Sequence, residues 1–427
     1  MKSYQVDDLS ILLEKEGSCE FQKVSYPIRY GRFNEVRTPD YVFQLDLNGQ
    51  LKYIQGRDQR WPHRSEWLKR TVGNDWVYYS AGDYKGIYDL FGEHYFPVLS
   101  YPSNSIMGDR MMGNKVVRSA LDAWEDLQDR MKGMLSDSLS QSLKEFLTSA
   151  TKNDRRILER KSQRLHDLIG GLVTVLPPDS RHVDYEMIPL IVADGCLYDC
   201  GFCRVKSFRG FMPRGQENIL EQIRNLREFY DRDLSNYNAV FLGFHDALGA
   251  SREVLEFAAV SAYEKWGFEY SYMKKARLFL FGTVDSLIRS EEILFETLNR
   301  LPFSTYLNIG LESADPDTLA FLEKPITAGK VREAFQRMTA INRTYDRIEV
   351  TSNFVFGNDL PLRHLTSLVE LINNQSGNRF NKGIVYLSPL VDDQNWNIRK
   401  RRETITKFYG IKTHCRLPVF LYLIQRL

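Results

Sequence analysis

The chain has 427 residues, of which 43% are hydrophobic, so it is too long for one ordinary domain and has enough apolar side chains for a sizeable core. Its 57 Lys and Arg nearly balance its 55 Asp and Glu, which excludes a global attraction to nucleic acid or acidic membranes. The five cysteines are sparse and clustered, which argues against a disulfide framework and favours a reducing, cytoplasmic location. Residues 1–10 show no apolar signal core, and no apolar run of about 18 residues predicts a membrane span.

The first 115 residues are rich in aromatic side chains and contain one strong turn signal. Residues 41–47 and 51–55 flank Asn48-Gly49, a pair that accepts positive φ at both central positions of a tight turn. This pattern predicts a β-hairpin within an α+β region over residues 1–115. The aromatic residues could form the core of this region or a wall facing a substrate, and burial in the core is the more common fate.

Residues 116–180 form a predicted helical segment that ends in a linker. Apolar residues recur at helical spacing from Val116 to Met134, and further helical stretches follow before residue 173. Their charged faces are typical of solvated surface. Residues 176–180 include Pro177-Pro178, which cannot continue a helix, so we expect the linker there.

Strands and helices alternate from residue 181 to residue 390. The expected strands are residues 188–192, 239–242, 278–281, 305–309, 348–355 and 384–387, with helices between them. This alternation predicts an α/β fold with a parallel sheet and right-handed crossovers, curled into an open, TIM-like partial (β/α)6 barrel. Such barrels place their chemistry at the carboxyl ends of the strands, so the residues after each strand are the candidates for a site.

Three of the five cysteines, Cys196, Cys200 and Cys203, lie in the loop after the first of these strands. Thiolates are metal ligands, and three on one short loop can hold three corners of an iron–sulfur cube. The remaining cysteines, Cys19 and Cys415, are distant in sequence, so the fourth iron would be open to a small molecule. A structural zinc site is the alternative, but zinc usually takes four ligands and no histidine has the customary spacing.

The spacing Cys-x3-Cys-x2-Cys, with Phe202 before the third cysteine, resembles the radical S-adenosylmethionine (SAM) superfamily. The block Gly310-Leu311-Glu312-Ser313 after the fourth strand is similar to one in elongator-type and methylthiotransferase-type members. The resemblance covers about residues 185–390 and implies a [4Fe–4S] cluster and SAM as cofactors, with the three clustered cysteines as cluster ligands. It implies an electron donor similar to flavodoxin or ferredoxin. It also implies reductive cleavage of SAM to a 5′-deoxyadenosyl radical that abstracts hydrogen from a substrate.

The same resemblance implies roles for residues at the other strand ends. Phe202 should contact adenine, and Gly243 should lie in the turn that holds the SAM amino group. His245 and Asp246 occupy this turn where the family commonly has Gly-Gly-Glu, so each is a candidate SAM contact, with a structural histidine as the alternative for His245. The carboxylate after the fourth strand should bind the SAM amino group or ribose hydroxyls, and the polar pair on the fifth strand should bind the ribose. These residues are Glu312, Ser352 and Asn353.

Residues 391–427 form a predicted basic C-terminal extension. Residues 397–427 hold eight Lys or Arg and one Glu, and residues 399–402 read Arg-Lys-Arg-Arg, which could contact phosphate. An RNA-modifying radical SAM enzyme is therefore one alternative, although the rest of the chain is net acidic. A non-catalytic iron–sulfur protein is a second alternative, but it leaves Gly243 and Glu312 without a role. The sequence favours an enzyme acting on a small molecule.

Overall fold

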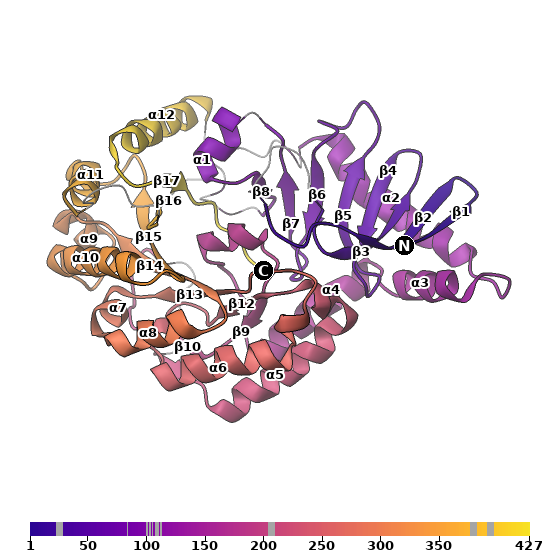
Figure 1. Ribbon diagram of the computed structural model, residues 1–427. Coiled ribbons are helices and arrows are strands. Elements are labelled where there is room, and N and C mark those ends of the chain that lie inside the picture. The colour runs from indigo at the N-terminus through magenta and orange to yellow at the C-terminus, as the bar shows by residue number, and fades with distance from the viewer. Residues whose placement is uncertain are drawn as a thin grey trace.

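The computed structural model describes the chain except for residues 23–28, 83, 100, 102–103, 105, 107–110, 112, 204–209, 376–381 and 391–396. Two large sheets organise it, an antiparallel sheet from residues 2–97 and a parallel sheet from residues 188–421. Figure 1 shows the two sheets next to each other, with the C-terminus between them. The mixed α/β class predicted from the sequence is confirmed.

Eight strands form the antiparallel sheet in simple sequence order. They are β1 (Lys2–Val6), β2 (Leu9–Glu16), β3 (Arg32–Arg37), β4 (Tyr41–Leu45), β5 (Leu51–Gly56), β6 (Trp67–Arg70), β7 (Trp76–Tyr79) and β8 (Tyr95–Pro97). The predicted hairpin is confirmed as β4 and β5, and Gly49 in its turn has a φ of 75°. An added Cβ at Gly49 would lie 2.7 Å from the backbone nitrogen of Ala150, so glycine also permits a helix to approach the turn.

Both faces of the antiparallel sheet are covered. After the short π-helix η1 (Tyr84–Tyr88) and α1 (Asp89–Phe91), the chain forms α2 (Lys115–Gly133), α3 (Gln141–Thr151) and α4 (Arg155–Ile169). The apolar faces of α2 and α3 pack on one face, where the ring centroids of Phe43 and Trp124 lie 5.7 Å apart. On the opposite face, Trp67 and Tyr79 belong to the hydrophobic core that also contains the parallel strands. Trp67 and Tyr79 are therefore core residues and do not form a wall facing a substrate.

Seven strands form the parallel sheet, in the order β17-β16-β15-β14-β13-β12-β9. They are β9 (Ile188–Leu190), β12 (Ala239–Leu242), β13 (Arg277–Gly282), β14 (Ser304–Glu312), β15 (Ile348–Phe356), β16 (Val385–Pro389) and β17 (Val419–Leu421). The helices between them are α5 (Gln216–Tyr230), α6 (Arg252–Lys265), α7 (Val284–Arg289), α8 (Glu292–Arg300), α9 (Pro316–Phe321), α10 (Ala328–Thr344), α11 (Arg363–Gln375) and α12 (Ile398–His414). Short 3-10 helices are η4 (Asp231–Asn236), η5 (Ala247–Gly249) and η6 (Phe268–Tyr270).

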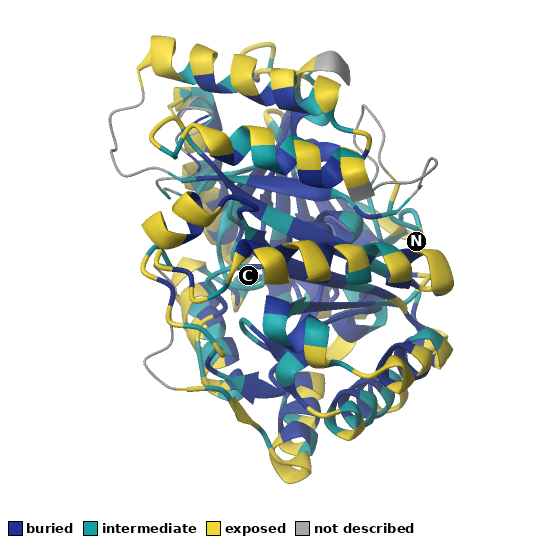
Figure 2. Ribbon diagram, turned by 90° about the vertical axis from the view of Figure 1, so that its left-hand side faces the viewer, coloured by how far each residue is buried: buried dark blue, intermediate teal, exposed yellow. Residues whose placement is uncertain are grey.

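The arrangement of these elements is the one expected for a partial barrel. Figure 1 shows α5 to α10 along the outer side of the strands, and Figure 2 shows exposed helix faces turned outward around buried strands. All six predicted strands are present at nearly the predicted positions. Among the described residues, no helix is both long enough and apolar enough to cross a membrane.

The C-terminal segment, predicted as a basic extension, contributes a strand to this sheet. The three residues of β17 pair in parallel with β16, so the sheet has one strand more than predicted. A three-residue apolar stretch is too short to show a strand pattern in the sequence. The predicted boundary after residue 390 adjoins residues 391–396, which lie outside the described residues.

The segment predicted as a linker is buried. Helix α4 already ends at Ile169, well before the proline pair, and η3 (Pro178–Val183) begins at the second proline. Asp179 and Ser180 of η3 have no exposed surface. The ring of His182 stacks on that of Tyr306 near the start of β14, at a centroid distance of 4.8 Å. The residues after the proline pair therefore fill the amino-terminal end of the barrel instead of crossing solvent.

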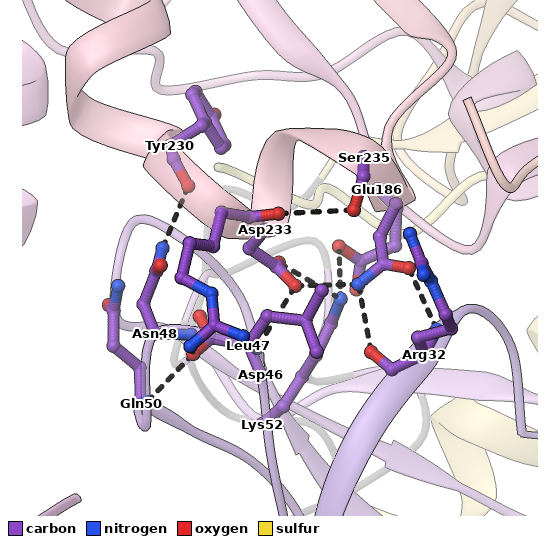
Figure 3. A network of polar contacts seen from close by, with 12 residues as sticks. Arg32, Asp46, Leu47, Asn48, Gln50, Lys52, Glu186, Tyr230, Asp233 and Ser235 are labelled. Atoms are coloured by element: carbon purple, nitrogen blue, oxygen red, sulfur yellow. Dashed lines mark hydrogen bonds and ion pairs between the residues drawn. The ribbon is translucent and has the colours of Figure 1, made fainter. Parts of the chain in front are cut away.

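A buried cluster of charged side chains joins the two sheets, and we call it the junction cluster (Lys52, Lys69, Glu186 and Asp233). Lys69 Nζ lies 2.6 Å from one Glu186 carboxylate oxygen, and Lys52 Nζ lies 3.1 Å from the other. Lys52 Nζ also lies 3.9 Å from Asp233 Oδ2. Figure 3 shows Lys52 of β5 reaching the carboxylates of the parallel-sheet half. Because these charges come from both halves, the cluster fixes the N-terminal sheet against the barrel.

Candidate functional site

A cavity of about 260 Å³ lies at the carboxyl ends of the parallel strands. It brings together seven of the ten predicted site residues, from the cysteine loop and from the ends of β12, β14 and β15. These are Cys196, Cys200, Phe202, Cys203, His245, Glu312 and Asn353. The lining also includes Tyr101 from the N-terminal region, and Tyr422 and Ile424 after β17. The site is therefore shaped by segments from the whole length of the chain.

The cysteine loop is closed at its base. Short strands β10 (Ala193–Asp194) and β11 (Met212–Pro213) pair antiparallel, and Cys196 forms a bridge with Gly210. Arg214 holds the Asp194 carboxylate with two hydrogen bonds of 2.6 and 2.8 Å. Such a bidentate pair has little rotational freedom. These contacts hold the two ends of the loop together at the cavity that the three thiols line.

The loop is also tied to the barrel through an aromatic side chain. The Tyr198 hydroxyl donates a hydrogen bond of 2.9 Å to Asp285 Oδ2 and accepts one from the Asp285 backbone N–H. The backbone N–H of Tyr198 donates to Cys196 Sγ at 3.5 Å. This contact places a positive dipole beside a sulfur atom, which favours the thiolate form needed for metal binding.

The three thiols of the loop all line the cavity. Burial raises the pKa of Cys196 to about 11 and also raises the pKa of Cys200, so a bound metal has to displace their protons. Within the described residues, no group of three or more His, Cys, Asp or Glu is arranged to hold a single metal ion. Each cysteine of a [4Fe–4S] cube binds a different iron, so its ligands need not converge on one point.

Glu312 is held in an unusual backbone conformation at the end of β14. The pairing of β14 with β15 shifts register between Gly310 and Glu312, and Glu312 has a φ of 64°. A side chain on Gly310 would lie 2.6 Å from Glu312 Oε1, so glycine leaves room for the carboxylate to fold back over the strand. Left-handed backbone at a non-glycine residue costs energy and is found mostly where structure or function requires it.

A lysine faces this carboxylate across the cavity wall. Lys324 Nζ lies 3.7 Å from Glu312 Oε1, and 5.1 Å from the centroid of the Tyr198 ring. Burial raises the pKa of Glu312, and the charge of Lys324 only partly offsets that effect. At 3.7 Å the pair is an ion pair too long to be a good hydrogen bond. Both groups therefore retain hydrogen-bonding capacity for a ligand.

The turn after Glu312 is secured by a buried histidine. His364 Nε2 lies 2.8 Å from the Val355 carbonyl, to which it must donate, so His364 Nδ1 accepts from the Ser313 hydroxyl, also at 2.8 Å. Ser313 Oγ in turn accepts from the backbone N–H of Asp315. Burial lowers the pKa of His364, which keeps its ring neutral and this pattern intact. The network holds the unusual turn without contributing to the cavity lining.

The turn after β12 contains three predicted site residues with different positions. His245 lines the cavity, and burial lowers its pKa. Gly243 does not line it, but its φ of 82° and the 2.7 Å that an added Cβ would leave to the Ala247 Cβ explain why glycine is needed there. Asp246 turns away, and its carboxylate accepts hydrogen bonds from the backbone and side chain of Thr283 and from Ser286. Asp246 thus fixes the start of α7 instead of facing the cavity.

The predicted polar pair on β15 is divided between two faces. Asn353 lines the cavity, whereas Ser352 is fully buried and does not. Successive strand residues point to opposite faces, so only one of the pair can face the barrel interior. The prediction that Ser352 contacts a ligand in this cavity is therefore not supported by its position.

Lys324 and Thr283 line the cavity and were not predicted as site residues. Lys324 belongs to the block Phe321 to Thr327 that follows the Gly-Leu-Glu-Ser motif, so the sequence contained a signal for it. Thr283 directly follows β13. Its position at the end of a predicted strand was the signal that could have identified it as a site residue.

Comparison with known proteins assigns the family of this part of the chain. Residues 190–372 match the model of the Radical SAM superfamily. This segment is a radical SAM domain. The predicted resemblance is confirmed, and with it the expected cofactors of the domain, a [4Fe–4S] cluster and SAM. The residues that hold these cofactors stay predictions.

The radical SAM domain has a similar segment in one curated enzyme. Over 178 residues the chain is 26% identical to ribosomal protein uS12 methylthiotransferase RimO of Herpetosiphon aurantiacus. The match covers 39% of this chain and 34% of that enzyme. The chain therefore spans about a third of the length of this curated relative.

Two solved structures match part of the chain at low sequence identity. The cobalamin-dependent SAM radical enzyme OxsB, with aqua-cobalamin and SAM bound, is 17% identical over 57% of this chain and 34% of its own, with a TM-score of 0.34. Elp3 from the archaeon Methanocaldococcus infernus is 14% identical over 48% of this chain and 52% of its own, with a TM-score of 0.32.

Proposed function

We propose that the protein binds a [4Fe–4S] cluster through Cys196, Cys200 and Cys203, and uses it to cleave SAM to a 5′-deoxyadenosyl radical that abstracts hydrogen from a small-molecule substrate. The observation that carries this proposal is the single cavity that joins the three thiols to Glu312 and Asn353 at the strand ends of a radical SAM domain. Three thiolates leave one iron of the cube without a protein ligand, and this iron can bind SAM.

The polar residues of the cavity fit the charges of SAM. Glu312 can accept hydrogen bonds from the SAM amino group or from ribose hydroxyls, because Lys324 leaves its carboxylate incompletely paired. Lys324 offers positive charge to the SAM carboxylate. Asn353 offers an amide to the ribose, and Phe202 offers a ring to the adenine. His245 lies on the same wall, while Gly243 allows the tight turn that presents backbone groups beside it.

Other groups near the cavity suit a small substrate. Apolar residues from separate parts of the chain complete the lining, among them Val175, Phe281 and Ile424. Such a wall can exclude water and so protect a radical from side reactions. Radical SAM chemistry also needs an electron donor, and we expect one similar to flavodoxin or ferredoxin. The sparse, clustered cysteines favour a reducing cytoplasm for this chemistry.

Substitution of each cysteine tests the proposal. Cys196→Ala, Cys200→Ala and Cys203→Ala should each abolish formation of 5′-deoxyadenosine from SAM under reducing, anaerobic conditions, because two thiolates cannot hold the cube in its site. Cys415→Ala is the matched control, since Cys415 does not line the described cavity and should leave cleavage intact. Full cleavage by any of the first three variants would contradict the proposal.

An RNA substrate remains the alternative, and salt dependence distinguishes it. Arg399 and Lys400 are exposed in the first turn of α12, where they could contact phosphate. If they do, tRNA binding should weaken by roughly 0.7–0.9 log units per contact for each log unit of salt, and neutralising residues 399–402 should weaken it further. We expect no tRNA binding of useful strength. Tight, salt-dependent binding would favour the RNA-modifying alternative.

A further inference from the structure

A column of hydrogen bonds runs through the barrel interior from η3 to the cavity. Thr351 Oγ1 lies 2.6 Å from Asp179 Oδ2 and accepts from Asn308 Nδ2 at 2.9 Å. Asn308 Oδ1 then accepts from Asn353 Nδ2 at 2.6 Å. Except for Asn353, which borders the cavity, these side chains are buried, with exposures of 0% for Asp179, Asn308 and Thr351. We call these four residues the interior column (Asp179, Thr351, Asn308 and Asn353).

The lower end of the interior column has a fixed direction. Arg181 Nε donates to the Tyr386 hydroxyl at 2.9 Å, and a guanidinium can only donate. The Tyr386 hydroxyl therefore donates its own proton in a hydrogen bond of 2.8 Å to Asp179 Oδ1. Burial raises the pKa of Asp179, whereas the charge of Arg181 and the hydrogen bond from Tyr386 lower it and favour a carboxylate there. An ionised carboxylate can only accept, so Thr351 must donate its hydroxyl proton to Asp179.

The direction set at Asp179 passes along the column to Asn353. Because Thr351 donates its one hydroxyl proton to Asp179, its oxygen can only accept a hydrogen bond from Asn308 Nδ2. This orients Asn308 with its oxygen toward Asn353, which must then donate its own Nδ2. The network thus determines the orientation of the Asn353 amide.

The upper end of the column leaves one polar atom unused. Asn353 Oδ1 is buried and has no hydrogen-bond partner among the described residues. Asn353 lines the cavity. A buried carbonyl without a donor costs free energy, and a ligand that brings a donor recovers it.

We propose that the interior column makes Asn353 a hydrogen-bond acceptor for a hydroxyl or ammonium donor of the ligand, with Asp179, Thr351 and Asn308 as positioning residues that prevent the amide from turning over. This rests on the proposed function, in which the donor is a ribose hydroxyl of SAM. The amide turned over would present its NH2 group to the same hydroxyl, and the column excludes that orientation. Asp179 thus influences a ligand that it does not touch.

A double-mutant cycle with S-adenosylhomocysteine tests this role. The probe is not cleaved, so its dissociation constant for the cluster-loaded full chain can be measured by calorimetry. Asn353→Ala removes the acceptor and should weaken binding roughly tenfold, and Thr351→Val should weaken it roughly three- to tenfold by freeing the amide. In the Asn353→Ala background, Thr351→Val should change binding less than about twofold, because it acts through Asn353.

Two further variants separate positioning from folding. Thr351→Ser keeps the hydroxyl and should bind the probe within about twofold of the wild type. Asn308→Leu breaks the column at its upper joint without touching Asp179, so it serves if Thr351→Val does not fold. Iron content and the thermal unfolding temperature of each variant show that cluster and fold are intact.

The outcomes are distinct. Equal weakening by Thr351→Val in both backgrounds would show a general structural role and overturn the inference. Unchanged probe binding by Asn353→Ala would overturn it while leaving the proposed function standing. If the cluster-loaded wild type did not bind the probe at all, the proposed function would fail, and the inference with it.

Discussion

Two largely buried glutamates, one at each end of the barrel half, have pKa values shifted in opposite directions. At Glu186, burial opposes ionisation, but the charges of Lys52 and Lys69 outweigh it and lower the pKa to about 2. At Glu312, burial again opposes ionisation, and the one neighbouring lysine does not overcome it, so the pKa is raised. Both carboxylates are largely buried beside lysine. They differ in how completely the protein pairs them.

This difference separates a structural charge from one that is available to a ligand. Each Glu186 oxygen has a lysine within 3.1 Å, so the junction cluster is saturated and gains nothing from a further partner. Glu312 has one lysine at 3.7 Å, and nearby Asn353 Oδ1 has no partner among the described residues. A folded protein keeps few such buried groups unless something else completes them. The incomplete pairing at the cavity is what a binding site requires.

The largest expected effect is on stability, at the saturated glutamate. Glu186→Gln should lower the free energy of unfolding by roughly 3–5 kcal/mol, because it leaves Lys52 and Lys69 buried with too little negative charge. Urea unfolding followed by fluorescence measures this. The control is Glu20→Gln, which breaks the exposed pair with Lys275 and should cost less than about 1 kcal/mol. Equal losses in the two variants would remove the distinction drawn for Glu186.

The next effect is on ligand binding, at the incompletely paired glutamate. Glu312→Ala should weaken SAM binding by ~1.5–3 kcal/mol, the worth of a charge-assisted hydrogen bond, while the cluster is retained. Its stability should fall less than that of Glu186→Gln, because one buried lysine loses a long ion pair instead of two lysines losing close ones. Calorimetry and iron analysis measure the two quantities. Unchanged SAM affinity together with collapse of the fold would show that Glu312 is structural.

A smaller expected effect concerns the charge of Asp46, which lies near Asp233 of the junction cluster. Burial, and then the nearby Asp233, raise the pKa of Asp46 to about 7. A carboxyl whose folded-state pKa lies above its ordinary value stabilises the fold at low pH, and this contribution is lost as pH rises from about 4 through 7. Asp46→Asn removes the charge and should be more stable than the wild type at pH 8, by on the order of 1–2 kcal/mol, with no advantage near pH 4.

The matched control for this variant is Asp129→Asn, because the Asp129 side chain is 81% exposed. Its difference from the wild type should be small at both pH values. Thermal unfolding at pH 4 and pH 8 measures both variants. An Asp46→Asn advantage that did not depend on pH would mean that Asp46 is ionised throughout, and that the junction tolerates its charge.

The sequence by itself determined the local elements and the motifs. Strands such as β12 and helices such as α5 lie almost where hydrophobic periodicity predicted them, because that signal resides in neighbouring residues. The Asn48-Gly49 turn is equally local, since it depends on the φ that two residues accept. The cysteine spacing and the Gly-Leu-Glu-Ser block identified the radical SAM domain for the same reason. Each is a short, contiguous pattern.

Tertiary structure alone decided which of these residues meet. Ser352 and Asn353 are adjacent and both polar, yet strand register sends one into the helix-covered face and the other into the cavity. The pairing of Glu186 with Lys52 and Lys69, and of Thr351 with Asp179, joins residues more than a hundred positions apart. Such contacts depend on how two sheets and a buried 3-10 helix pack together, and packing over that separation leaves no periodic pattern in the sequence.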